Sequence, residues 1–156
     1  MIEYRLNNDS RLVLTDPAIL HFKKSRQLRV WSRESGGQLF ATFDGPVVTV
    51  REVTGPRRSD RRGRWYFRPD RAAEIAEITV MYKRGLHFIG DWHTHPQDVP
   101  QPSTLDVDSL ADCVRRSEHQ LLGFFLIVVG RQLPPEGLHV SYHDGTKFHW
   151  LSPLLD

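Results

Sequence analysis

Apolar residues spaced three and four positions apart predict three helices, and each is marked by an end signal. Asp16 and Pro17 begin the first helix, with Asp16 as the N-cap and Pro17 at the first helical position. Gly85 lies where the C-terminal cap of the second helix is expected. The predicted helices cover residues 16–28, 69–85 and 103–118.

Runs of β-branched and aromatic residues between these helices predict strands. The turn sequences at 44–46 and 144–145 each separate two such runs, so each predicts a hairpin. Two further runs are apolar enough to be buried strands. The predicted strands are 38–43, 47–53, 86–92, 123–129, 138–142 and 147–151. This order of elements predicts an α/β fold in which helices pack on a mixed sheet.

The composition is that of a globular protein. The chain has 156 residues, 39% hydrophobic and 26% charged, which suits a single domain over residues 1–156. The longest apolar run, 121–129, is too short to span a bilayer, and the first residues lack the apolar core of an export signal. Cys113 is the single cysteine and is expected to be a core or surface filler. We therefore expect a cytoplasmic protein without a membrane segment.

Basic residues gather in one stretch, although the net charge is only +2. Such a cluster attracts nucleic acid or an acidic protein surface, but a solvated loop is the more common explanation. The aromatic residues that follow, 65–67, are expected in a strand or in the core. The clustered arginines are Arg57, Arg58, Arg61, Arg62 and Arg64.

Two histidines and an aspartate carry the strongest signal for chemistry. His93 and His95 lie at the end of a predicted strand, where residues two apart point to the same side. Pro96 ends that strand, and Asp106 falls in the first turn of the third helix, from which its carboxylate can return towards the histidines. Two imidazoles and one carboxylate suit zinc, and three protein ligands leave a fourth position open, as in catalytic sites.

Each part of this pattern also has an ordinary structural explanation. Histidine pairs on strands are common without a metal, and Ser103 with Asp106 forms a helix-capping pattern. Asp98 and Asp108 are alternative carboxylates in the same segment. The joint spacing of strand end, histidines, proline, loop and helix start favours the metal site.

The other histidines carry less signal. His139 and His143 point to one face of a predicted strand, but no acid follows at a matching spacing, so they are expected to be incidental. His87 is expected in the core or behind the ligands. Trp92 precedes His93 and should point the other way, into the core.

His-x-His at 93–95, then seven residues and Ser-x-x-Asp at 103–106, is the signature of the JAMM (MPN+, Mov34/PAD-1) metalloproteases, which this chain resembles. The Glu-Ser-Gly-Gly sequence at 34–37 is similar to the upstream element that carries the family's catalytic glutamate. The resemblance implies a single MPN domain: a curled mixed sheet flanked by about three helices and similar to cytidine deaminases. It also implies a peptidase or isopeptidase that uses Zn²⁺.

The resemblance also implies a role for each site residue. Glu34 would take a proton from the attacking water and deliver it to the leaving amine. Ser103 would donate a hydrogen bond to the oxyanion. Glu52 is the alternative base, but it lacks the neighbouring glycine pair. The implied zinc ligands are His93, His95 and Asp106.

The sequences at 34–40 and 90–96 are similar to those of JAMM peptidases from bacterial CBASS anti-phage operons. This likeness implies removal of a cGAS-like nucleotidyltransferase from its conjugates, with an E1/E2-like conjugating protein as operon partner. The alternatives are a JAMM peptidase for a ubiquitin-like or sulfur-carrier protein, a non-catalytic scaffold, and a nucleic-acid-binding module. Related enzymes hold the extended substrate tail with an insertion, so we expect the arginine stretch at 57–64 to border the substrate groove.

Overall fold

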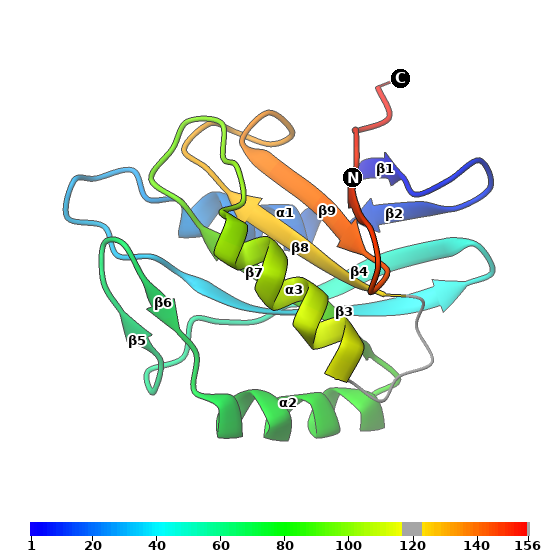
Figure 1. Ribbon diagram of the computed structural model, residues 1–156, viewed down its shortest axis with the longest axis horizontal. Coiled ribbons are helices and arrows are strands. Elements are labelled where there is room, and N and C mark those ends of the chain that lie inside the picture. Colours follow the sequence, from blue (N-terminus) through cyan, green and yellow to red (C-terminus); the bar gives the residue numbers. More distant parts are fainter. Residues whose placement is uncertain (117–122, 156) are drawn as a thin grey trace.

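The computed structural model describes residues 1–116 and 123–155 (Figure 1). In these residues eight strands form one mixed sheet in the order β1-β2-β4-β3-β7-β8-β9-β10, and β5 and β6 form a separate pair. Strands β2 and β4 are parallel, as are β7 and β8, and the other neighbours are antiparallel. The helices are α1 (Asp16–Ser25), α2 (Arg71–Lys83) and α3 (Thr104–Arg116). The strands are β1 (Ile2–Arg5), β2 (Arg11–Leu14), β3 (Gly36–Asp44), β4 (Val47–Val53), β5 (Arg61–Arg62), β6 (Phe67–Arg68), β7 (His87–Thr94), β8 (Phe124–Val129), β9 (Leu138–His143) and β10 (Phe148–Trp150).

Helices cover both faces of the sheet (Figure 1). Helix α1 packs with Leu39, Ala41 and the indole of Trp92 in the largest apolar cluster. Phe40 points to the opposite face and packs with α2, because neighbouring residues of a strand alternate between faces. Helix α3 lies on that same face over β8. The α/β fold and its three helices are confirmed for the described residues.

The ends of α2 follow the sequence signals. The Asp70 side chain accepts a hydrogen bond from the Ala73 N–H at 3.2 Å, as an N-cap does. Gly85 follows the helix with φ +79°, a left-handed conformation that favours glycine. The buried side of α2 is unexpectedly polar, since it includes Glu74 as well as Met81, while Tyr82 is 67% exposed.

Helix α1 begins at Asp16 as predicted, but the predicted N-cap and the predicted C-terminal end were wrong. Thr15 is the N-cap residue, and Asp16 lies in the first turn, where its carboxylate binds the N-terminal amine at 2.6 Å. The helix ends at Ser25 rather than near Leu28. The chain leaves the helix there because the amide of Gln27 is buried against β7, where it makes tertiary hydrogen bonds.

Strands β1 and β2 were missed by the sequence analysis. Each has only four residues, and their turn is held by the Asn7 side chain, which accepts from the N–H groups of Asp9 and Ser10. Such a side-chain turn between two short apolar runs is the signal that could have found them. The predicted hairpins are confirmed. The predicted helix residues 117–118 and apolar residues 121–122 lie outside the described residues.

Strand β7 runs through His93 to Thr94, two residues further than predicted. Trp92 is buried on the α1 face, as expected, and its Nε1 donates to the Thr54 carbonyl at 2.8 Å. No helix in the described part of the chain combines the length and apolar character needed to cross a membrane.

Candidate functional site

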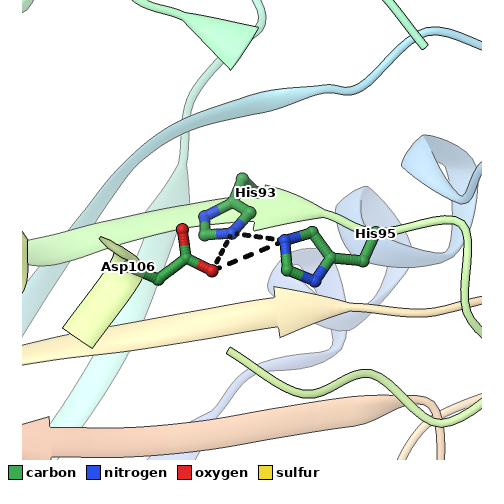
Figure 2. A group of neighbouring side chains, drawn as sticks. All are labelled: His93, His95 and Asp106. Carbon is green, nitrogen blue, oxygen red and sulfur yellow. Dashed lines mark hydrogen bonds and ion pairs between the residues drawn. The ribbon is translucent and has the colours of Figure 1, made fainter. Parts of the chain in front are cut away.

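The three predicted metal ligands meet beside the end of β7 (Figure 2). His93 Nε2 lies 3.1 Å from His95 Nε2. The Asp106 Oδ2 atom lies 3.3 Å from the first nitrogen and 3.5 Å from the second. Strand β7 supplies His93, the residues after it supply His95, and the first turn of α3 supplies Asp106. Two imidazole nitrogens and one carboxylate oxygen thus converge on one point.

The separations of these three atoms fit a tetrahedral zinc ion. Ligand distances of about 2.0–2.1 Å place neighbouring donor atoms of a tetrahedron about 3.3–3.4 Å apart. The His95 Nδ1 lies 2.9 Å from the Gln101 carbonyl oxygen, to which it donates a proton, so Nε2 of the neutral ring carries the lone pair. The donor set therefore suits zinc or a similar divalent cation.

The local charges favour the protonation states that bind metal. Burial raises the pKa of Asp106, but the hydrogen bond and charge of His93, with the hydrogen bonds of Ser103, outweigh it and hold that pKa below its usual range. Burial, reinforced by His93, lowers the pKa of His95. An ionised carboxylate and a neutral imidazole are the forms that coordinate a metal.

The loop between the histidines and α3 is fixed by its own contacts. The His95 N–H donates to the Val129 carbonyl at 2.9 Å, at the end of β8. Asp98, an alternative ligand in the sequence analysis, instead forms an ion pair with Arg131 at 2.9 Å. Asp108, the other alternative, is exposed on α3 and outside the ligand group.

Ser103 and Asp106 cap α3, and Asp106 also faces the two histidines. The Ser103 N–H donates to Asp106 Oδ2 at 2.8 Å, and the Asp106 N–H donates to Ser103 Oγ at 3.1 Å. This is the reciprocal arrangement of a capping box. Because Ser103 Oγ accepts that bond, its hydroxyl proton can still be donated to another acceptor. The capping explanation and the ligand explanation are therefore compatible.

Glu34 is buried near the ligands. It lies two residues before Gly36, the register partner of His93 in the antiparallel β3–β7 pair. Burial raises the pKa of Glu34 to about 7, with His93 opposing the rise and Asp106 adding to it. A carboxyl with a pKa near neutrality can both accept and return a proton. Glu52, the alternative base, forms an ion pair with Arg84 on the surface.

The glycine pair after Glu34 is required by close packing. A Cβ on Gly37 would lie 1.8 Å from the Thr54 carbonyl oxygen, far inside any contact distance. A Cβ on Gly36 would lie 2.6 Å from the Phe67 ring. Only glycine at these two positions lets Thr54 and the hairpin of β5 and β6 approach the start of β3 this closely.

A buried hydrogen-bond chain that the sequence analysis missed joins Glu34's segment to the metal-ligand strand. The Ser35 N–H donates to Thr94 Oγ1 at 2.9 Å, and that hydroxyl donates to Gln27 Oε1 at 2.7 Å. Gln27 Nε2 in turn donates to the carbonyls of Ser32 and Arg64 at 3.3 and 3.2 Å. No local motif marks Gln27, because two of its three partners, Arg64 and Thr94, come from distant segments.

The arginine stretch is more than a solvated loop. Arg62 donates from Nε to the Glu34 carbonyl at 2.6 Å and from Nη2 to Ser35 Oγ at 2.7 Å. Arg57 forms an ion pair with Glu77 at 2.5 Å. Arg62 therefore braces the segment that carries Glu34, and Arg57 ties the arginine stretch to α2. Residues 65 and 66, expected in a strand or the core, are instead exposed.

The remaining histidines differ from their expected roles. His139 is buried, and its Nε2 lacks a hydrogen-bond partner within the described residues. In the sheet, Val128 of β8 is the register partner of His139 on one side and of His93 on the other. Burial, followed by the charge of His93, lowers the pKa of His139 to about 4. His143 accepts the Gly145 N–H and holds a turn. His87 is exposed against the rings of Phe43 and Tyr82, so its expected place near the core was wrong.

Comparison with known proteins agrees with this geometry. A protein from Escherichia coli (strain TW11681), named "CD-NTase/cGAS isopeptidase", is 26% identical over 127 residues, which cover 80% of this chain and 79% of that protein. A Vibrio cholerae protein of the same name is 29% identical over 134 residues, which cover 83% and 82%.

Solved structures share the fold. A solution structure from Desulfitobacterium hafniense superposes with a TM-score of 0.60 at 18% identity, covering 89% of this chain and 88% of that one. The crystal structure of a JAB1/MPN domain protein from Archaeoglobus fulgidus does so with a TM-score of 0.50 at 14% identity, covering 85% and 91%. The family model for prokaryotic homologs of the JAB domain matches residues 19–142, and this chain therefore belongs to that JAB/MPN family.

Proposed function

We propose that this protein is a zinc-dependent isopeptidase whose base is Glu34 and whose ligands are His93, His95 and Asp106. The observation that carries the proposal is the convergence of three donor atoms 3.1–3.5 Å apart beside a buried glutamate. A zinc ion held there supplies Lewis acidity, which lowers the pKa of water and polarises a carbonyl.

The protein's own residues carry the proton. Glu34 accepts a proton from the water that attacks the carbonyl carbon, as a C–O bond forms. Ser103 donates its hydroxyl proton in a hydrogen bond to the carbonyl oxygen as that oxygen gains charge. Glu34 then gives the proton to the leaving amine as the C–N bond breaks. The products are a carboxylic acid and an amine, and Glu34 returns to its starting form.

For the substrate, we infer an isopeptide bond at the C-terminus of a cGAS-like nucleotidyltransferase. The names of the relatives from Escherichia coli and Vibrio cholerae support this choice over a ubiquitin-like or sulfur-carrier protein. The proposal includes a role in CBASS defence, an E1/E2-like protein that makes the conjugate, and a cytoplasmic location. The five-residue set of ligands, base and serine favours an enzyme over a scaffold.

Metal analysis combined with a cleavage assay tests this function. We expect Glu34→Ala to keep the metal and lose turnover, because Glu34 is not among the three converging donors. We expect His95→Ala to lose both. The first measurement is metal content by mass spectrometry. The second is release of a fusion partner from the C-terminus of the proposed substrate, a cGAS-like nucleotidyltransferase.

Glu52→Ala is the matched control. Glu52 is also a glutamate, but it pairs with Arg84 on the surface and is not among the candidate metal ligands. It should retain metal and turnover. Full activity in Glu34→Ala would exclude the proposed mechanism. Cleavage of a ubiquitin-like conjugate but not of the nucleotidyltransferase fusion would keep the mechanism and replace the substrate.

A further inference from the structure

A pocket with four arginines opens beside the segment that carries Glu34. Its volume is about 270 Å³. It lies between the loop before β3 and the pair of strands β5 and β6, which are side by side in Figure 1 and joined by the Glu34 N–H to Gly63 carbonyl bond at 2.7 Å. The lining residues are Arg33, Pro56, Arg57, Arg58, Asp60 and Arg62.

The acidic groups at this pocket are already engaged. Asp60 accepts the Arg57 N–H at 2.6 Å with one oxygen and the Asp70 N–H at 2.8 Å with the other. Glu77 pairs with the Arg57 guanidinium. These two carboxylates hold the loop and offset part of the charge, but four guanidiniums share the pocket with only one lining acid. The pocket therefore keeps a net positive charge.

The arginines of the pocket fall into two kinds. Arg57 and Arg62 are fixed by bonds to the protein, and one nitrogen of Arg57, Nη1, is buried without a hydrogen-bond partner. Arg33 and Arg58 are exposed and make no hydrogen bond or ion pair with the described residues, so their donors can reach a ligand. Burial and then repulsion from Arg33 lower the pKa of Arg62. An anion bound between the two guanidiniums would relieve this repulsion.

The size and donors of the pocket restrict its ligand to a small anionic group. A volume of about 270 Å³ admits one side chain or one phosphate group but no nucleic-acid helix. Guanidinium groups bind carboxylates with paired, charge-assisted hydrogen bonds. Arg33 is the neighbour of Glu34 in sequence, and Arg62 bonds to the Glu34 carbonyl, so a group bound here lies next to the catalytic segment.

We propose that the arginine pocket is a subsite for one Asp or Glu side chain of the substrate chain near the scissile bond. This inference rests on the proposed isopeptidase function for its biological meaning. It assigns Arg33 and Arg58 as residues that determine substrate selectivity, and Arg62 as a residue that also holds Glu34 in place. A substrate without the acid would still reach the metal centre but would bind more weakly.

Binding of short peptides to the metal-loaded Glu34→Ala variant, which should not cleave them, tests the pocket separately from cleavage. The probes are fluorescein-labelled hexapeptides that carry one Glu or one Gln at each position in turn, measured by fluorescence anisotropy. At one or two positions we expect the Glu peptide to bind about tenfold more tightly than its Gln counterpart. Arg58→Glu and Arg33→Glu should abolish this difference, and raised salt should reduce it.

Arg61→Glu is the matched control, because it makes the same charge change on β5 outside the pocket lining. It should keep the preference for Glu. Equal binding of Glu and Gln peptides at every position would overturn the proposal, as would an equal loss in Arg61→Glu. Inorganic phosphate that displaces the peptide at concentrations below the peptide's own Kd would also overturn it and make the pocket a phosphate site.

The two proposals fail separately in this design. Acid-selective binding without cleavage of any fusion would support the proposed subsite and exclude the proposed isopeptidase function. Cleavage with no acid selectivity would leave the isopeptidase and exclude the subsite.

Discussion

The two halves of the candidate site are built in different ways. The metal half, His93, His95, Ser103 and Asp106, comes from one strand, one loop and one helix start within residues 93–106. The base half is the Glu34–Ser35 segment with the residues that hold it, and these supports come from three other parts of the chain. They are Gln27, Arg62 and Thr94.

This difference predicts that the halves respond differently to substitution. Loss of one of the three donors in the metal half should alter metal content and turnover together, because those donors would hold the ion. A change in the base half should alter turnover and stability while the metal stays bound. Thr94 belongs to both by position, since it lies between the two histidines and bonds to Ser35 and Gln27.

The largest effect is expected from Asp106→Ala. The change removes one donor and one partner of the α3 cap, so the metal should be lost and turnover should fall more than about a thousandfold. Asp108→Ala, two residues along the same helix, should change neither. Metal content and initial cleavage rates measure both. Retention of the metal in Asp106→Ala would show that Asp106 is not a ligand.

Ser103→Ala should have the next largest effect. Loss of the oxyanion donor should lower kcat about a hundredfold, and loss of the cap should lower the free energy of unfolding by about 1 kcal/mol. The metal should remain, because Ser103 is not among the converging donors. Ser103→Thr keeps a hydroxyl and should restore most of kcat. If Ser103→Ala changed only stability, Ser103 would be a helix cap alone.

Gln27→Leu tests the base half. The variant leaves the Ser32 and Arg64 carbonyls without their donor and Thr94 without its acceptor. We expect the free energy of unfolding to fall by about 1–3 kcal/mol and kcat to fall about tenfold, with the metal retained. Urea unfolding, kcat and metal content measure this, with the exposed Gln132→Leu as control. Loss of metal in Gln27→Leu would contradict the division into halves.

The smallest effect on turnover is expected from Glu74→Gln, because Glu74 lies in α2, outside both halves of the site. Burial, reinforced by Asp91, raises the pKa of Glu74 to about 7. The folded state therefore binds a proton more tightly than the unfolded state, whose carboxyl has an ordinary pKa of about 4.3. Stability from this group is present below about pH 4.3 and is lost as pH rises towards 7, by at most about 4 kcal/mol.

Glu74→Gln should flatten that part of the pH dependence and stabilise the protein above pH 7. Unfolding measured in urea between pH 5 and 8 provides the comparison. The exposed variant Glu136→Gln is the control, and it should leave the slope unchanged. An unchanged slope in Glu74→Gln would place the titrating group elsewhere.

The same division explains how much the sequence could predict. The sequence could bring the three candidate ligands together because a strand period, a proline and a helix start fix their directions within one short segment, and their side chains do converge. Most strands and α2 were found because their signals are local as well. Gln27 was missed, and α1 was predicted too long, because tertiary hydrogen bonds take residue 27 out of the helix. The buried Glu74 was missed because the exposed Tyr82 and Ile75 mimic an apolar face.

The shared oxygen of Asp106 has a consequence for the protein as a whole. Oδ2 accepts the Ser103 N–H and also faces both imidazoles, so the first turn of α3 and the metal centre use the same atom. A ligand that binds only the folded form stabilises it in proportion to the logarithm of its concentration. A metal bound by the proposed ligands would thus raise the free energy of unfolding as well as support activity, and chelation would lower that free energy.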